Sequence, residues 1–450
     1  MSQTRPDSSG FSMDYEKAVK VLPLGLSLFM FLALVLGALF LPSKLGPTPH
    51  NWFSDYALAL SQGRLYVGEG TQWRDCKWDQ SFFEGKCYLY FGIVPALFHW
   101  FLPFVSNRLF SIFGVAFFTY FFSKLLLQLS GFRSKDPVDW FLSSLLILSS
   151  VCASSFIALG LCSRVYEEAI CFAHTFGMGG VFLGLPVLFD QEEQGSSTHL
   201  WLTSFFFTLA SLSRATWFPV FFIFCIMVLV KQQISRKQPL FSLQTLPPFL
   251  GLGLALGFQG WLNNSRFHSF TDFGVNYVSS TIRYEEQLKS GYGLFSWRFI
   301  IPNFTSYYFI RFIPSGGGFV LRGTEGWLQG ILLKNVRFLE SPHTLSLTCF
   351  GSFLCFLQGR AWWDFCKKVW PVVVLISPLA LINLSQDSII YRYQLEVSLP
   401  FFLVSIPFLI SISNKMSQKL FLITTLASLV GIGFSIANSL EATTRFWKVL

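Results

Sequence analysis

The carboxylate of Asp55 lies in sequence surroundings that suit proton transfer. Residues 53–62 have the pattern of a short amphipathic helix that Gly63 ends, with Ser54 as its candidate cap. Asp55 would then lie in the first turn, shortly after a long apolar run. A carboxylate that is partly desolvated near a lipid surface can act as a general base. The alternative is a purely electrostatic role, in which Asp55 stabilises the N-terminal end of the helix.

Two further acidic residues end the segment 163–168, which begins Ser163-Arg164 and ends Glu167-Glu168. Charged side chains at a membrane boundary must be hydrated or paired. Arg164 and Glu168 have the i,i+4 spacing of a helical salt bridge, which would contribute only about 0.3–0.5 kcal/mol. Adjacent side chains on a helix point about 100° apart, so one glutamate could face a cavity while the other pairs locally.

Arg392 lies between two tyrosines in the polar segment 386–396. Arginine binds phosphate oxygens in a bidentate manner, and flanking aromatic residues favour a position at a membrane interface. An arginine that only extends its charge to lipid headgroups has the same surroundings. The six histidines show no zinc-binding spacing, and the chain has no Walker A, GxSxG or GxGxxG motif. The sequence therefore predicts neither a zinc site nor a nucleotide-phosphate site.

Cysteine positions leave one question open. Cys76 and Cys87 lie in one polar loop, whereas the other seven cysteines lie in or beside apolar runs. These two form a disulfide if the loop faces an oxidising compartment and the geometry allows it; otherwise they are free thiols.

The composition places these residues in a membrane protein. Charged residues make up 13% of the chain, hydrophobic residues 52%, and the mean hydropathy is +0.51. Soluble proteins contain about 25% charged residues. This excludes a soluble globular enzyme, a disordered chain and a nucleic-acid-binding module, despite the formal net charge of +9. We therefore expect an all-α polytopic membrane protein, in which the excess Lys and Arg orient short loops.

The apolar runs predict about eleven transmembrane helices. The first, 21–42, contains no charged residue and is long enough to cross a hydrocarbon core of about 30 Å. No signal-peptide cleavage site follows it, so we expect it to be retained. Splitting the run 200–230 at Arg214 keeps an arginine out of the middle of a helix, where it would cost at least about 2.5 kcal/mol. The further candidate spans cover 109–130, 139–162, 169–189, 200–213, 215–230, 239–262, 341–358, 370–385, 397–413 and 420–440.

The apolar segment 88–104 decides on which side of the membrane the rest of the chain lies. If it is interfacial or re-entrant, the short loops and the tail on the N-terminal side carry thirteen Lys or Arg, and the short segments and the C-terminal tail on the opposite side carry five. A spanning segment would reverse this count, against the positive-inside rule. We therefore place the tail 1–20 in the cytoplasm and the long loops 43–108 and 263–340 on the non-cytoplasmic face.

One transmembrane domain, 21–440, then includes both long loops and is followed by a tail, 441–450, with no separate soluble domain. The short loops 163–168 and 386–396 lie on the same face as the long ones. Any chemistry must come from these four loops at the outer membrane–water boundary.

Several blocks of the chain carry a family resemblance: SDYALALSQGRLYV, DQSFFEGKCYLYFGIVPAL, SRVYEEAICFAHTFGMGGVFL, ASLSRATWFPV and WLNNSRFHSFTDFGVNYV. Together they resemble the uncharacterised bacterial branch of the GT-C class of membrane glycosyltransferases. The most specific parts are GKCYLYFGIVPAL and RVYEEA. The resemblance covers about residues 21–285 and is thin beyond them.

The resemblance implies an inverting transfer from a polyprenyl-phosphate sugar to a glycan, lipid or protein acceptor of the cell envelope. It places the reaction on the outer face of a bacterial cytoplasmic (inner) membrane. It also implies that Asp55 is the general base on the acceptor hydroxyl. Glu167 or Glu168 occupies the place of a second acidic residue in a later outer loop.

Basic side chains hold the lipid phosphate in such enzymes, and Arg164 and Arg392 are the candidates in this chain. His50 and Tyr166 are further candidate substrate contacts. Many family members carry paired acids in the first loop, whereas this chain has Asp55 alone. No metal site is therefore assigned, and a requirement for a divalent cation stays open.

Two other classes of function compete with this hypothesis. A transporter or flippase of a lipid-linked substrate predicts charged residues along a path through the bundle, whereas this sequence concentrates them at one boundary. A structural membrane subunit would leave the charged outer loops without a role. The glycosyltransferase is therefore the leading hypothesis.

Overall fold

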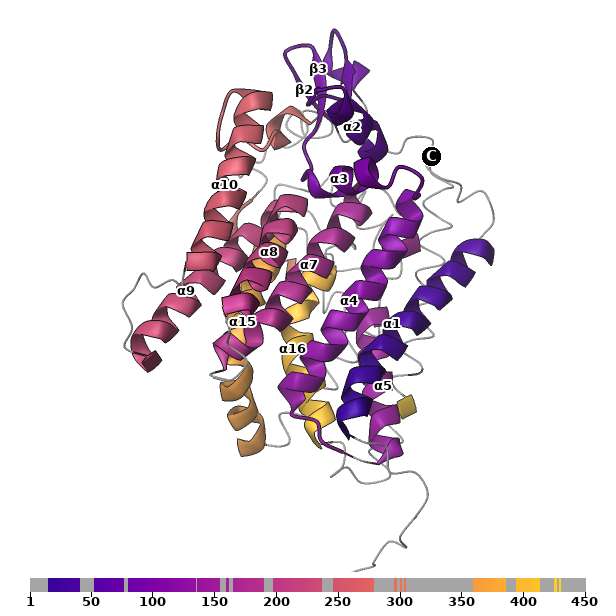
Figure 1. The fold of residues 1–450 in the computed structure, drawn as a ribbon, viewed down its shortest axis with the longest axis vertical. Helices are drawn as coiled ribbons and strands as arrows, with labels where there is room; N and C mark the ends of the chain where they lie inside the picture. The colour runs from indigo at the N-terminus through magenta and orange to yellow at the C-terminus, as the bar shows by residue number, and fades with distance from the viewer. Residues whose placement is uncertain are drawn as a thin grey trace, which may run out of the picture.

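The described part of the chain is a bundle of long helices that carries a small mixed unit of helices and strands at one end (Figure 1). A computed structural model describes residues 15–40, 52–76, 80–134, 136–153, 159–161, 165–189, 197–236, 246–278, 295–297, 300–301, 303–304, 359–385, 394–412, 425–426 and 429. The bundle helices are α1 (Tyr15–Phe40), α4 (Asn107–Ser130), α5 (Pro137–Ala153), α7 (Val165–Leu188), α8 (Ser197–Ser213), α9 (Phe218–Arg236), α10 (Leu246–Phe267), α15 (Arg360–Leu384) and α16 (Gln394–Ile412).

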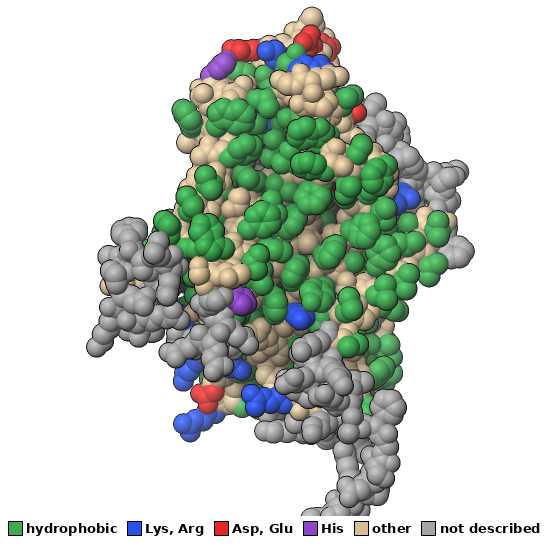
Figure 2. Space-filling view, viewed as in Figure 1, with side chains coloured by type: hydrophobic (Ala, Val, Ile, Leu, Met, Phe, Trp, Pro, Cys, Tyr) green, Lys and Arg blue, Asp and Glu red, His purple; other side chains and the backbone are tan. Residues whose placement is uncertain are grey.

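Among the described residues, five helices are long and apolar enough to cross a membrane. These helices are α1, α4, α7, α15 and α16. Figure 2 shows a broad hydrophobic surface over the bundle, with charged side chains gathered toward its two ends. An apolar surface between two polar ends is what a lipid bilayer requires of a spanning protein. The chain is thus a helical membrane protein.

The described residues do not show the predicted eleven spans. α5 and the segment Ala215–Lys231 are apolar but shorter than the five long helices. The predicted span 341–358 lies outside the described residues, and of 420–440 only 425–426 and 429 are described.

Two predicted loops are also wrong in their bounds. The segments 163–168 and 386–396 were expected to be loops because each carries charged residues. In the structure, α7 already includes Glu167 and Glu168, and α16 already includes Glu396. Acidic side chains in a first turn are favourable, so a helix can begin before its apolar stretch does.

Glycines let α7 approach its neighbours closely. A Cβ added at Gly177 would lie 2.1 Å from the Trp217 ring, and one at Gly180 would lie 2.9 Å from the Phe207 ring. Small residues at helix contacts let membrane helices approach each other closely, which increases van der Waals contact. α7 consequently packs against both α4 and α8 and is the central helix of this half of the bundle.

The predicted break at Arg214 is confirmed. Arg214 has extended backbone angles, φ −154° and ψ 124°, between α8 and the short 3-10 helix η3 (Ala215–Trp217). Its side chain therefore leaves the bundle axis at a helix junction and not from the middle of a continuous helix.

Residues 52–104, which we call the cap, contain more regular structure than the sequence predicted. They form α2 (Trp52–Ser61), β1 (Gly68–Glu69), η2 (Trp73–Asp75), β2 (Gln80–Phe83), β3 (Lys86–Leu89) and α3 (Val94–Phe101). The antiparallel strands have the order β1-β3-β2. Glu84 and Gly85 form the β2–β3 turn with φ 48° and 75°. Positive φ at both central residues is typical of a tight hairpin, so the Glu-Gly pair was the missed signal.

The short helix α3 explains the ambiguous segment 88–104. Its eight residues extend only about 12 Å at 1.5 Å per residue, far less than a bilayer core. Trp100, Phe101 and Phe104 are nevertheless exposed. An exposed apolar edge on a non-spanning helix fits an interfacial segment and excludes a full span here.

The cap also contacts the chain that follows α10. Ser81 Oγ donates a hydrogen bond to the Gly274 carbonyl at 2.7 Å, and Ser81 forms a β-bridge with Val278. The predicted loop 43–108 therefore meets the start of the predicted loop 263–340 at one end of the bundle.

Cys76 and Cys87 form a disulfide, with a Cα–Cα distance of 5.4 Å, between the end of η2 and strand β3. We expect both thiols to resist maleimide until the protein is reduced. Replacing both by serine should lower the local stability of the cap by about 2–3 kcal/mol, because the short covalent loop no longer restricts the unfolded chain. Amide hydrogen exchange of β3 measures this change. Cys366→Ser, at a free and half-buried cysteine, is the control. Labelling of Cys76 without reductant would contradict the disulfide.

Candidate active site

Three side chains from three helices form a hydrogen-bonded chain between the cap and the bundle. Ser54 lies in the first turn of α2, His99 in the last turn of α3 and Glu168 in the first turn of α7. His99 Nε2 lies 2.7 Å from Glu168 Oε1, and His99 Nδ1 lies 3.1 Å from Ser54 Oγ. With a proton on Nε2, the ring donates to Glu168 and accepts the Ser54 hydroxyl at Nδ1. These two hydrogen bonds can pass a proton between the helices and can fix how the helices are oriented.

The His99–Glu168 pair is closed off from water. Both side chains are 0% exposed, and the Phe110 ring packs edge-on against His99 with a centroid distance of 4.6 Å. Among the described residues, nothing donates to the second carboxylate oxygen of Glu168. A buried carboxylate is costly unless it is paired. His99 is therefore the group that makes the buried position of Glu168 tolerable.

Asp55 lies on the exposed face of α2 and directly follows Ser54 in sequence. Phe53 and Tyr56 form the buried face of the same helix. The sequence predicts Ser54 as the cap of this helix. In the structure Ser54 is instead the third residue of α2, because the helix begins two residues earlier. Asp55 is thus a water-accessible carboxylate at the cap end of the bundle.

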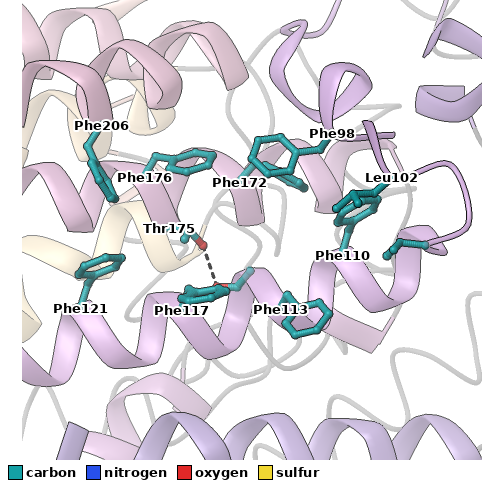
Figure 3. A pocket seen from close by; sticks show the side chains of 12 residues that line it. Phe98, Leu102, Phe110, Phe113, Phe117, Phe121, Phe172, Thr175, Phe176 and Phe206 are labelled. Carbon is teal, nitrogen blue, oxygen red and sulfur yellow. Dashed lines mark hydrogen bonds between the residues drawn. The ribbon is translucent and has the colours of Figure 1, made fainter. Parts of the chain in front are cut away.

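Directly beneath α3 is an apolar cavity of about 420 Å³ (Figure 3). Phenylalanines from α3, α4, α7 and α8 supply eight of its twelve lining residues. The hydroxyl of Thr175 is already used, since it donates to the Gly114 carbonyl at 2.7 Å. Phe117 both lines the cavity and is exposed on the outer surface of α4, so the cavity reaches the apolar surface of the bundle. Its chemistry suits a hydrocarbon chain.

The cavity and the hydrogen-bonded chain share a wall. Phe110 lines the cavity and contacts the His99 ring, and Phe98 lines it from the residue before His99. Figure 3 shows Phe98 and Phe110 at the same end of the cavity. A ligand in the cavity would therefore lie one aromatic ring away from His99.

A second buried polar group lies where the end of α10 meets α2 of the cap. Arg266, in the last turn of α10, is 1% exposed. Its guanidinium lies over the Tyr56 ring, 5.2 Å from the centroid, and Nη2 donates to the Tyr56 hydroxyl. Its Nε has no acceptor, and no carboxylate of the described residues forms an ion pair with it.

A third polar cluster ties the C-terminal helices to the bundle. Glu396 Oε1 accepts from Arg214 Nη1 at 2.7 Å and lies 3.4 Å from His174 Nε2. Asn383 Nδ2 donates to the other oxygen of Glu396. The cluster joins α7, the α8–η3 junction, α15 and α16, which makes it a structural tie.

The structure places only some of the predicted site residues. Asp55 and Glu168 lie at the same end of the bundle, linked through Ser54 and His99. Glu168 pairs with His99, whereas the sequence had suggested a salt bridge with Arg164. Glu167 is buried beside Glu168. For Tyr166 the structure describes only the backbone, in the first turn of α7; His50, Arg164 and Arg392 lie outside the described residues.

Sequence reasoning missed His99, His174 and Arg266. His99 and His174 are isolated polar residues in aromatic or apolar stretches, Arg266 lies in a polar stretch at the end of α10, and each has a partner far away in sequence or on another helix. A lone histidine in the apolar run VPALFHWF was the available signal, but nothing in the sequence identified its partner.

Among the described residues, no group of three or more histidine, cysteine, aspartate or glutamate side chains could hold a metal ion. Comparison of the chain with protein-family models and with curated protein sequences finds no match. The assignment of function therefore depends on the geometry described above and on the sequence resemblance.

The buried pair makes a prediction about stability. His99→Ala should lower the free energy of unfolding by about 3–5 kcal/mol, because it leaves Glu168 buried without its partner. Glu168→Gln should cost much less, since the amide still accepts a hydrogen bond from His99. Unfolding by SDS titration measures both.

The matched control is Glu84→Gln, which breaks the His268–Glu84 pair, where both side chains are more than 60% exposed. An exposed pair contributes about 0–1 kcal/mol. Equal losses for His99→Ala and Glu84→Gln would show that the buried pair does not constrain the cap.

Proposed function

We propose that this chain is a membrane glycosyltransferase that takes a sugar from a polyprenyl-phosphate donor and transfers it, with inversion, to an acceptor of the cell envelope. The apolar cavity beneath the cap carries this proposal. A carrier with a long hydrocarbon chain needs such a lined cavity, open to lipid, close to a water-accessible carboxylate.

The cavity supports the lipid end of the donor. Phenylalanine side chains dominate its wall, and its one hydroxyl, that of Thr175, is satisfied within the protein. A transport path for a charged headgroup would need polar groups along its walls. The described cavity offers none, which favours a chain-holding role over the transporter or flippase alternative.

Asp55 is our candidate for the general base. In a single displacement with inversion, the acceptor hydroxyl attacks the anomeric carbon, loses its proton to the carboxylate, and releases the lipid phosphate. The phosphate is a good leaving group, so the protein needs only to orient the reactants, remove one proton and stabilise negative charge. An exposed carboxylate on α2 is accessible to an acceptor that arrives from water.

The remaining site residues take supporting roles in the proposal. Because His99 holds Glu168, we assign Glu168 to positioning α3 and α2, and keep Glu167 as the second acidic candidate. Arg164 and Arg392 remain candidates for the lipid phosphate. His50 and Tyr166 remain candidates for other substrate contacts, and a divalent cation stays an open requirement.

We also propose the finer topology. Eleven spans would place the cap on the non-cytoplasmic face of a bacterial inner membrane, with both predicted outer loops beside it. The Lys and Arg count and the contact between the cap and residues 274–278 support this arrangement.

Asp55→Asn tests the proposed base. Reconstituted protein and labelled polyprenyl-phosphate sugars should show a loss of transfer of at least about a hundredfold, because an amide cannot take the acceptor proton. Glu69→Gln, at an exposed carboxylate on β1 in the same cap, should leave transfer unchanged. Full activity of Asp55→Asn would remove this residue from the mechanism.

Phe117→Asn tests the cavity. A polar amide in the wall should raise the KM for the lipid donor about tenfold, because it removes apolar contact with the chain. Phe205→Asn is the matched control: Phe205 is 57% exposed against 54% for Phe117, but it does not line the cavity. An equal change in KM for both variants would argue against the cavity as the chain site.

A further inference from the structure

Arg266 is an anomaly in the described part of the chain, because its charge is buried and no carboxylate pairs with it. Among the described residues, its hydrogen-bond and ring partner is Tyr56, and Nε has no acceptor. Buried charges in proteins are paired or hydrogen-bonded throughout, because desolvation costs more than one neutral partner returns. Arg214, whose side chain is only 13% exposed, follows this rule through Glu396.

A second tyrosine, Tyr88, lies within electrostatic reach of Arg266. Tyr88 is buried and contacts Phe267, the neighbour of Arg266, with a centroid distance of 5.3 Å. Burial raises the pKa of Tyr88, the charge of Glu84 raises it further, and the charge of Arg266 lowers it. Tyr88 therefore stays protonated, and its phenol interacts electrostatically with the Arg266 guanidinium.

Toward the cap surface, Tyr66 packs edge-on against Tyr88 at 6.3 Å. Two cations flank Tyr66: Lys86 Nζ lies 5.1 Å and Arg64 Cζ 5.5 Å from its centroid. The carboxylate that acts on Tyr88 is that of Glu84, and it is paired with His268 at 3.1 Å. These two cations place positive charge beside Tyr66 at the cap surface.

We infer that the Arg266 guanidinium and the Tyr56 hydroxyl form a binding site for an oxyanion of the phosphate class, between the end of α10 and α2. Guanidinium suits two parallel hydrogen bonds to phosphate oxygens, and its free Nε is one of the donors such a pair uses. The same chemistry is offered by free phosphate and by a lipid phosphomonoester. The inference does not depend on the proposed transfer reaction.

The test uses the full chain in neutral detergent at constant ionic strength. Thermal unfolding is followed in increasing inorganic phosphate, and separately in nanodiscs with and without phosphatidic acid. We expect a rise in the unfolding midpoint with one or both phosphate sources. A response to inorganic phosphate assigns the site to a soluble oxyanion; a response to phosphatidic acid alone assigns it to a lipid headgroup.

Arg266→Met removes the charge at similar length. It should weaken the apparent phosphate affinity at least about tenfold and leave the midpoint without phosphate equal to or above that of the wild type. Tyr56→Phe should weaken the affinity by a smaller factor. Arg74→Met, at an exposed arginine that stacks on Trp73 in the same cap, should keep the full response.

Three results would overturn the inference. Neither phosphate source shifts the wild-type midpoint, the response survives in Arg266→Met, or Arg266→Met unfolds at a lower temperature without phosphate, as a purely structural arginine would. If Arg266→Met does not fold, Arg266→Lys and Tyr56→Phe decide: an unchanged response in both rejects the site. None of these results changes the expected loss of transfer in Asp55→Asn.

Discussion

A carboxylate buried in an apolar bundle must be neutralised or paired, and the His99–Glu168 hydrogen bond meets this requirement at the top of α7. The two groups belong to different parts of the protein, since His99 is on the cap helix α3 and Glu168 is on the central bundle helix. Satisfying Glu168 therefore fixes where the cap lies. Ser54 extends the constraint to α2, so the exposed position of Asp55 follows from a partly buried contact of the preceding residue.

The apolar packing around this contact has the same effect. Gly92, between the sheet and α3, passes so close to the end of α8 that a Cβ would lie 2.0 Å from the Leu212 carbonyl oxygen. Phe110 presses on His99 from the cavity side. Close packing on two sides therefore holds the cap together with its polar contacts, of which His99–Glu168 is the buried one at α7. Larger residues at Gly92 would push α3 away from the cavity that lies beneath it.

Hydropathy and spacing predicted the parts of this structure that are local. The apolar runs gave most of the long described helices, Arg214 marked a real break, and the α2 pattern with Gly63 located the helix that carries Asp55. The helix ends were less predictable, because Glu167, Glu168 and Glu396 extend helices beyond the apolar runs. The small sheet was missed because its strands are short, and a Glu-Gly pair is a weak signal without its partners.

The contacts that define the candidate site could not be predicted in this way, since they join residues far apart in sequence. His99 and Glu168 are 69 residues apart, and Arg266 and Tyr56 are 210 apart. A single sequence shows that each residue is polar in apolar surroundings but not which partner it meets. The disulfide was open for a similar reason, because spacing permits a bond and geometry decides it.

The partly buried Arg214 and the buried Arg266 can be compared for the way in which each charge is stabilised. Arg214 has a carboxylate partner at 2.7 Å, and that carboxylate is further bonded to Asn383. Arg266 has the phenol of Tyr56 as its partner. The cation–π contact with the ring stabilises the guanidinium by about 0.5–2 kcal/mol, and the hydrogen bond to the hydroxyl stabilises it by about 1.5–3 kcal/mol. A favourable helix C-terminus adds at most about 2 kcal/mol. Breaking a buried ion pair typically costs about 3–5 kcal/mol, so these terms roughly cancel an unpaired charge without a surplus. Arg266 therefore contributes little to the free energy of folding. An oxyanion that binds to it would interact with a cation that is already desolvated and oriented.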